Sequence, residues 1–295
     1  MIPHKALKNL RLGLAAAALL WLVSTADPAS AGETLRQQLV YEVYAGGIHA
    51  VQAHMDIDLS KKNKYSLVLD AKTRGFLGSL IPWEGSFESY GWILKDGKYQ
   101  PERHQSTATW RNEADIKEYL YNKNGSFKSL RITDEHSAAE LREVDDEVTN
   151  GTVDILSATL QVLDAYNEME TCAGESEIFD GKRRFKQIFR HEEAVTLTES
   201  KYNIYGGPAA KCTVEVVPVN GEWHKKPRGW MSIQEQGRAK GTMPTVWIAQ
   251  VAENGPAVPV KIRVKTAYGT LFMHLAEYKS ADTVLIAEKR MPEDE

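Results

Sequence analysis

Side chains that could perform acid–base or metal chemistry are spread along the sequence without a recognisable spacing. The chain has no GxSxG, HExxH, phosphate-binding-loop or dinucleotide-binding motif. Its histidines beyond the first thirty residues contain no HxH or HxxxH pair, so we expect them on strand surfaces rather than around a metal; they are His49, His54, His104, His136, His191, His224 and His274. The sequence therefore predicts no catalytic residue, no metal site and no cofactor, and we expect a protein that is not an enzyme.

One basic segment, FDGKRRF at residues 179–185, allows two interpretations. Lys182, Arg183 and Arg184 could form an anion-binding site. Alternatively, Asp180 and Gly181 form a turn that leads into a strand with an exposed basic face. We favour the turn, because Asp-Gly is a common turn pair and the segment carries no further sign of a ligand site.

The sequence has two cysteines, Cys172 and Cys212, and neither has a CxxC partner or a histidine nearby in sequence. An even pair in an exported protein is typical of a disulfide. Closing a loop of about 40 residues stabilises a fold by roughly 4 kcal/mol in the chain-entropy model. A Cys-containing metal site and a catalytic thiol are the alternatives, and we predict the disulfide Cys172–Cys212.

The segment FLGSLIPW at residues 76–83 is unusually apolar for a connection between strands. On a helical wheel its large side chains share one face, which predicts a short amphipathic helix or tight loop. It could be a plug that closes one end of the sheet, a lid over an apolar cavity, or a surface that touches a membrane. The candidate lid residues for an apolar ligand are Phe76, Leu77, Leu80, Ile81 and Trp83.

The elements that would position these residues are mostly strands. Residues 51–59 and 258–265 alternate apolar and polar side chains, as half-buried strands do, and similar segments bring the total to roughly a dozen. Such alternation favours antiparallel pairing. Residues 152–168 have apolar side chains at helical spacing, with Thr152 as the expected N-cap. We expect loops at residues 134–151 and 221–241.

Together these elements predict a mainly β protein. A large curved antiparallel sheet, either a half-barrel or a β-spiral, would wrap around one long α-helix at about residues 152–168, because a sheet of a dozen strands rarely stays open and flat. Residues 32–295 would form a single β-rich periplasmic domain.

The first thirty-one residues are typical of a secretory signal peptide. Lys5, Lys8 and Arg11 precede an apolar run of about a dozen residues, and Ala29-Ser30-Ala31 fits a cleavage site before Gly32. An uncleaved membrane anchor is the alternative, but the run is shorter than the roughly 20 residues that span a bilayer. Removing residues 1–31 takes three basic residues and one acid, which changes the net charge from −4 to about −6. An acidic chain disfavours nucleic acid as a partner.

Several segments resemble, in order and spacing, the exported bacterial family catalogued as domain of unknown function 3108. They are YEVYAGGI (41–48), TRGFLGSLIPWEGSFESYG (73–91), PERH (101–104), TVDILSATL (152–160), FDGKRRF (179–185), CTVEVVPVNGE (212–222), VWIA (246–249) and PVKIRVKTAYGT (259–270). The resemblance implies a periplasmic protein of a Gram-negative bacterium and attaches no catalytic residue. The layout is also similar to that of β-spiral envelope-integrity proteins with one disulfide, and to that of half-barrel lipoprotein carriers.

From these observations we expect a non-catalytic periplasmic protein that supports cell-envelope integrity. It would bind a lipid, an acyl chain or another apolar ligand in the concave face of the sheet, without stable membrane insertion after signal cleavage. The first alternative is an interaction scaffold for envelope proteins, anchored through Trp223, Arg228 and Trp230 or through an edge strand. The second is a hydrolase whose site is assembled from distant residues.

Overall fold

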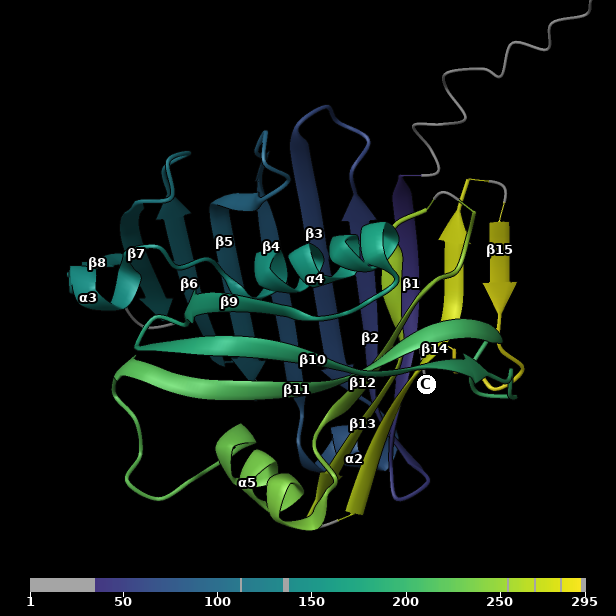
Figure 1. Cartoon of the computed structure of the whole chain (residues 1–295). Coiled ribbons are helices and arrows are strands. Elements are labelled where there is room, and N and C mark those ends of the chain that lie inside the picture. The colour runs from purple at the N-terminus through teal and green to yellow at the C-terminus, as the bar shows by residue number, and fades with distance from the viewer. Residues whose placement is uncertain are drawn as a thin grey trace, which may run out of the picture.

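A computed structural model describes residues 35–111, 113–134, 138–253, 255–267, 269–281 and 283–292 (Figure 1). The predicted signal peptide and its cleavage site lie outside the described residues, as does His136. The described residues form one large antiparallel sheet, as the alternation predicted. Its strands are β1 (Arg36–Ala45), β2 (Ile48–Asp58), β3 (Lys64–Thr73), β4 (Trp83–Ile93), β5 (Tyr99–Trp110), β6 (Glu113–Tyr121), β7 (Phe127–Asp134), β8 (Glu140–Arg142), β9 (Gly174–Phe179), β10 (Arg183–Leu197), β11 (Gly207–Gly221), β12 (Thr245–Gln250), β13 (Ala257–Thr266), β14 (Gly269–Ser280) and β15 (Thr283–Ile286).

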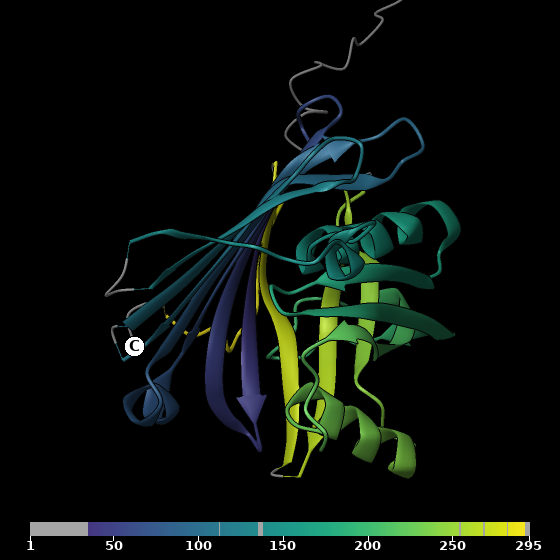
Figure 2. The same cartoon turned by 90° about the vertical axis from the view of Figure 1, so that its left-hand side faces the viewer.

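The sheet runs in the order β8-β7-β6-β5-β4-β3-β2-β1-β14-β13-β12-β11-β10-β9, with β15 paired to β14. Strands β8 and β9 end this order and do not pair with each other among the described residues, so the sheet is not closed. It nevertheless bends until its two ends meet. The Tyr119 hydroxyl on β6 donates to the carbonyl oxygen of Asp180 beyond β9 at 2.9 Å, and Phe179 packs with Tyr119, Tyr121 and Leu130. We call the two halves the N-terminal arm (β1–β8) and the C-terminal arm (β9–β14), and Figure 2 shows them side by side.

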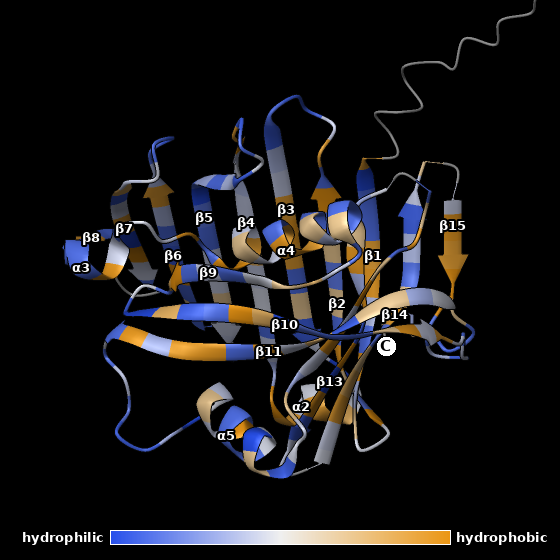
Figure 3. Cartoon of the chain, viewed as in Figure 1, coloured by the Kyte–Doolittle hydropathy of each residue, from blue (hydrophilic) through white to orange (hydrophobic). Residues whose placement is uncertain are grey.

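The core lies between the two arms. Alternation of apolar and polar residues along the strands, visible in Figure 3, gives each arm one apolar face. Tyr41, Leu67 and Ile57 from the N-terminal arm pack in one cluster with Val258 and Leu275 from the C-terminal arm. Burial of this shared face holds the arms together, because each large aliphatic or aromatic side chain contributes roughly 1.5–3 kcal/mol.

Helix α4 (Ile155–Met169) lies between the arms and contacts β4 and β5 on one side and β9, β12 and β13 on the other. It begins later than predicted. Val153 forms an isolated bridge with Ile178, and the N-cap is Asp154 rather than Thr152, with Asp154 Oδ1 accepting the N–H groups of Leu156 and Ser157. Extended backbone at Val153 delays the start of the helix.

The expectation of a sheet wrapped around one long helix is not supported, because the helices are short. Helix α4 has 15 residues and spans about 22 Å. Strands β10 and β11 also have 15 residues each, and such a strand spans about 50 Å. The helix therefore covers only part of the apolar face of the C-terminal arm, and other side chains must cover the rest.

The remaining helices are α2 (Gly75–Leu80), α3 (Asp146–Thr149) and α5 (Trp230–Lys240). Both predicted loops contain regular structure, since α3 and β8 fall in residues 134–151 and α5 falls in residues 221–241. In both views α2 and α5 lie toward the same end of the molecule (Figures 1 and 2). Among the described residues, no helix is both long and apolar enough to cross a bilayer.

Candidate functional site

A cavity of about 520 Å³ lies between strands β10–β11 and the segment that leads into α5. Its walls are mostly apolar, and they are formed by strands β10 and β11, the start of α4 and part of the 221–241 segment. The main lining side chains are Ile155, Phe185, Gln187, Val216, Trp223, Trp230 and Met231. Phe185 also packs on Ala158 of α4. The cavity therefore occupies the part of the apolar face that α4 leaves uncovered.

Helix α5 forms one wall, and a side chain fixes it to the sheet. Strand β11 pairs with β12 only over Ala210–Thr213, so its later residues have a free edge. Gln234 of α5 occupies this edge, with Oε1 accepting the N–H of Val216 at 2.7 Å and Nε2 donating to the carbonyl oxygen of Val216 at 2.8 Å. The buried Gln234 amide thus replaces a neighbouring strand, which explains why a segment of weak helical pattern adopts a defined position.

The Trp223 ring forms a second wall. Its Nε1–H donates to the carbonyl oxygen of Asn220 at 2.9 Å, and its ring meets that of Phe185 edge-on at a centroid distance of 6.2 Å. The Arg183 guanidinium lies over the Trp223 ring, 4.9 Å from the ring centroid. These contacts fix the ring orientation, because edge-on aromatic pairs and cation–π contacts each have a preferred geometry.

Two residues that line the cavity carry buried polar atoms without a hydrogen-bond partner among the described residues. These atoms are Gln187 Oε1 and Trp230 Nε1, an acceptor and a donor. A buried polar atom left without a partner costs about 1–3 kcal/mol. Orphaned atoms of this kind call for an explanation, and a bound ligand is one.

The charged residues around the cavity are divided between paired and exposed groups. Asp180 accepts from the Lys182 and Arg183 N–H groups and from the Arg183 guanidinium, and Arg184 forms an ion pair with Glu177. This confirms the turn at Asp180 and Gly181, and leaves two of the three basic residues of FDGKRRF in ion pairs. Arg228 and His224, which also line the cavity, are exposed at its edge. An anionic group at the mouth would face Arg228.

A second polar cluster joins α4 to the N-terminal arm. Ser89 Oγ donates to Asp154 Oδ1 at 2.7 Å and lies 2.7 Å from His104 Nδ1. Ser157 Oγ donates to Asp154 Oδ2 at 2.5 Å and meets the Tyr65 hydroxyl at 2.5 Å. Burial raises the pKa of Tyr65, and the Asp154 carboxylate raises it further, so the phenol keeps its proton.

The combination of Ser89, His104 and Asp154 is the set of groups that a hydrolase would need. Here, however, Ser89 is 1% exposed, and Asp154 Oδ1 accepts two helix N–H groups. A nucleophile must be reachable by its substrate. The cluster instead caps α4 and joins it to β4 and β5, which is a structural role.

The predicted lid residues lie elsewhere, at the end of the hairpin between β3 and β4. Phe76 is 71% exposed, Leu80 and Ile81 are exposed, and Leu77 and Trp83 are half-buried. A plug would be buried, so the segment does not plug the sheet. None of the candidate lid residues lines the apolar cavity. The predicted short helix is present as α2.

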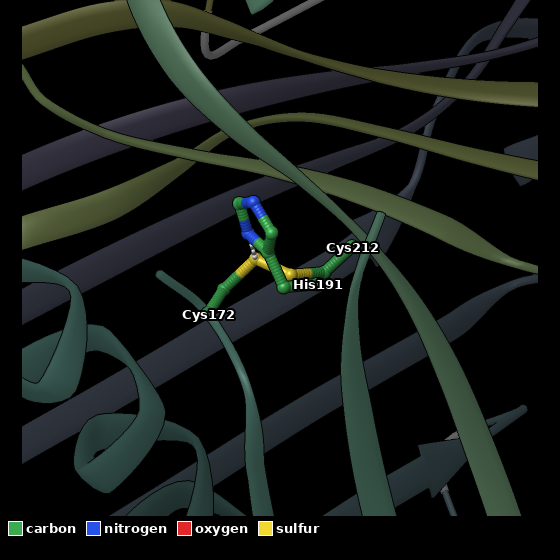
Figure 4. A group of neighbouring side chains, drawn as sticks. All are labelled: Cys172, His191 and Cys212. Carbon is green, nitrogen blue, oxygen red and sulfur yellow. Dashed lines mark hydrogen bonds between the residues drawn. A yellow bond between two sulfur atoms is a disulfide. The ribbon is translucent and has the colours of Figure 1, made fainter. Parts of the chain in front are cut away.

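Cys172 and Cys212 form a disulfide with a Cα–Cα distance of 6.2 Å (Figure 4). It joins the chain beyond α4 to β11, whose later residues line the cavity. His191 is opposite Cys212 in the β10–β11 register, and its Nδ1 lies 3.9 Å from Cys172 Sγ. This neighbour could not be expected from residue spacing, because it is the β10–β11 register that brings His191 to the sulfurs. While the sulfurs are bonded to each other, they do not offer thiolate ligands to a metal.

Sequence reasoning missed Gln187, Met231 and Gln234. Gln187 could have been noticed, since it falls between Phe185 and Phe189 on the apolar face of a strand. A polar residue on such a face marks either a buried hydrogen bond or a ligand contact. The other two lie on a helix that the sequence did not predict.

The model of the family described as "Protein of unknown function (DUF3108)" matches residues 40–276. The chain belongs to this family. No curated protein matches. Among solved structures, the chain is similar to a beta-barrel-like protein of domain of unknown function DUF1849 from Brucella abortus, at 8% identity and a TM-score of 0.49, over 84% of this chain and 98% of that one.

Proposed function

We propose that this protein is a non-catalytic binding protein of the bacterial cell envelope that holds an apolar ligand, a lipid or other acyl chain, inside its sheet. The observation that carries the proposal is the cavity beside α5, which has apolar walls and two orphaned polar atoms. Its volume of about 520 Å³ falls within the roughly 300–1,000 Å³ of small-molecule sites.

The cavity suits an amphiphile better than a purely polar solute. Phe185, Val216 and Met231 offer apolar contact, and Gln187 and Trp230 offer an acceptor and a donor. Arg228 at the edge would favour an anionic end group. An acyl chain with a polar head matches all three regions at once.

The proposed setting is the periplasm of a Gram-negative bacterium, reached through the signal sequence at residues 1–31. In this setting the curved sheet would act as a half-barrel or β-spiral whose concave face shields the ligand from water, and the ligand-bound protein would support envelope integrity. The chain itself would stay soluble after cleavage near Ala31 and Gly32.

Titration of the delipidated protein with a fluorescent fatty acid tests the proposal. Trp223→Ala removes a cavity wall and should weaken binding at least about tenfold, since a large buried side chain contributes roughly 1.5–3 kcal/mol. Met231→Trp should weaken it by filling the space. Trp92→Ala, on β4, is the matched control and should bind as the wild type does. Equal binding by the wild type and all three variants would show that the cavity beside α5 is not the fatty-acid site.

One observation supports the alternative function, an interaction scaffold. Edge strand β15 exposes Val284, Leu285 and Ile286. An exposed apolar edge can accept a strand from a partner. Val284→Lys/Ile286→Lys would then abolish capture of an envelope protein without changing fatty-acid binding, and unchanged capture by this variant would reject the edge strand as the partner site.

A further inference from the structure

Exposed apolar side chains gather at one end of the N-terminal arm. They come from the connections β1–β2, β3–β4 and β5–β6, and we call them the apolar rim: Ile48, Phe76, Leu80, Ile81 and Trp110. Phe76 is 71% exposed and Ile48 is 61% exposed. Helix α2 buries none of its residues. A gathering of large exposed apolar side chains is unusual in the absence of a binding role.

Hydrogen bonds between neighbouring connections make the rim one continuous surface. The Arg74 N–H donates to the carbonyl oxygen of Ala50 at 3.0 Å, which joins α2 to β2. The Thr73 hydroxyl donates to the carbonyl oxygen of Ile81 at 2.7 Å. Trp110 is opposite Trp83 in the β4–β5 register, and the Arg111 N–H donates to the carbonyl oxygen of Pro82. The apolar side chains are thus held at fixed positions on adjacent hairpin ends.

Two arginines lie beside the rim, in the same β3–β4 and β5–β6 connections. Arg74 and Arg111 line a second cavity, of about 370 Å³, together with Trp83 and Glu84. Arg74 is only 8% exposed; its Nη2 donates to the carbonyl oxygen of Pro292, and its Nε has no hydrogen-bond partner among the described residues. Among the residues that the structure describes, neither Arg74 nor Arg111 has a carboxylate within ion-pair distance.

A buried guanidinium that has no carboxylate partner among the described residues can bind an anion, because an unpaired charge away from water is costly. Arg111 also lies over the Trp110 ring at 6.0 Å, so it stands between the cavity and the apolar rim. The positive charge and the apolar surface are therefore presented together, and a phosphate group that enters this cavity would have apolar side chains immediately outside it.

We propose that the apolar rim docks onto a lipid bilayer that contains anionic phospholipids. Phe76, Leu80 and Ile81 would enter the boundary between headgroups and acyl chains, as apolar side chains of peripheral proteins do. Trp110 would lie at the headgroup level. Arg74 and Arg111 would bind lipid phosphates, for which a guanidinium is well shaped.

The shape of the surface favours a bilayer over a protein as the occupant. The rim consists of side chains from separate hairpin connections, and its two arginines belong to the β3–β4 and β5–β6 connections as well. A peptide partner fits a groove or a free strand edge, whereas exposed apolar side chains with cations beside them match a membrane surface, where acyl chains and phosphates lie close together. The chain as a whole carries a net charge of −4, so attraction to anionic lipid must come from this local pair of arginines.

Co-sedimentation with lipid vesicles tests the proposal. Wild-type protein should bind vesicles of phosphatidylcholine with phosphatidylglycerol more tightly than vesicles of phosphatidylcholine alone. Phe76→Ser/Ile81→Ser should weaken binding to both more than tenfold. Arg111→Gln should weaken binding to the anionic vesicles about fivefold, as loss of one surface cation does, and leave the neutral vesicles unaffected.

Matched controls lie on β8, which is distant from the rim in the sheet order. Leu141→Ser removes an apolar side chain that is 64% exposed, and Arg142→Gln removes an exposed cation. Both should bind vesicles within twofold of the wild type. All variants change exposed side chains, so unchanged melting temperatures will show that they fold.

Absence of vesicle binding by the wild type would overturn the proposal, as would equal binding by Phe76→Ser/Ile81→Ser. Fatty-acid titration of the same variants separates this result from the proposed function. The rim does not line the cavity beside α5, so rim variants should retain wild-type affinity for the soluble fatty acid whether or not they bind vesicles.

Discussion

Two clusters of buried polar side chains, on opposite arms of the sheet, differ in whether their hydrogen-bonding groups are satisfied. Around Asp154, each carboxylate oxygen accepts from at least one donor, and Ser89, Ser157 and Tyr65 complete the set. Beside α5, Gln187 Oε1 and Trp230 Nε1 have no partner among the described residues. The polar atoms of the first cluster are paired with one another, whereas two polar atoms of the second have no described partner.

This difference in hydrogen bonding indicates different roles for the Asp154 cluster and the cavity beside α5. A satisfied buried network stabilises and specifies the fold, whereas an unsatisfied one destabilises the ligand-free protein. Ser89, His104 and Asp154, the residue types of a hydrolase site, lie in the buried network that holds α4 in place. The proposed ligand site instead has aromatic and aliphatic walls.

Loss of the disulfide should have the largest effect on stability. The disulfide holds β11, which lines the cavity beside α5, to the chain that follows α4. Cys172→Ser/Cys212→Ser should lower the free energy of unfolding by about 4 kcal/mol, the value expected for a closed loop of 40 residues. Urea denaturation measures it. An unchanged midpoint would show that the bond is not structural.

The next largest loss of stability is expected from disrupting the hydrogen-bond network around Asp154. Asp154→Ala removes the N-cap of α4 and leaves Ser89 and Ser157 without their acceptor, so it should cost about 3 kcal/mol. Glu168→Ala, an exposed position on the same helix, should change stability by less than about 0.5 kcal/mol. Equal effects of the two changes would mean that the cluster does not hold the helix.

Two buried glutamines near the cavity differ in their hydrogen bonding: the Gln234 amide is paired, and the Gln187 amide oxygen has no described partner. Gln234→Leu removes an amide whose oxygen and nitrogen are both hydrogen-bonded, and it leaves the Val216 N–H without an acceptor. It should destabilise the protein by about 2 kcal/mol. Gln187→Leu removes an amide with an orphaned oxygen and should raise the free energy of unfolding by up to about 1 kcal/mol while weakening fatty-acid binding. Destabilisation by Gln187→Leu would show that its oxygen is satisfied in solution.

How far the sequence predicts these regions depends on the range of the contacts involved. Alternation along β2 and β13 predicts an antiparallel sheet, because one buried face suffices to specify a strand. The segment of α5 has no strong helical pattern, and its position depends on Gln234 reaching the edge of β11. The unsatisfied site arises from strands, a loop and a helix together, so no single stretch of sequence could reveal it.

A pH dependence of stability is expected from another buried polar group without a partner. His274 Nδ1 has no partner among the described residues, and burial, with Lys261 nearby, lowers the pKa of His274 to about 4. The unfolded chain, with an ordinary histidine pKa of about 6.5, binds this proton more readily. Stability should therefore be full above pH 6.5 and fall as the pH drops toward 4. His274→Gln should flatten that part of the profile, and exposed His224→Gln should not; identical profiles would reject the assignment.

Native mass spectrometry of the protein, purified without detergent from its own cells, tests the central claim most directly. Wild-type protein should carry one lipid or fatty acid that organic extraction releases, and Trp223→Ala should carry much less. Protein that emerges at the mass of the bare polypeptide, with an extract no different from that of the variant, would contradict the claim that the cavity beside α5 holds an apolar ligand.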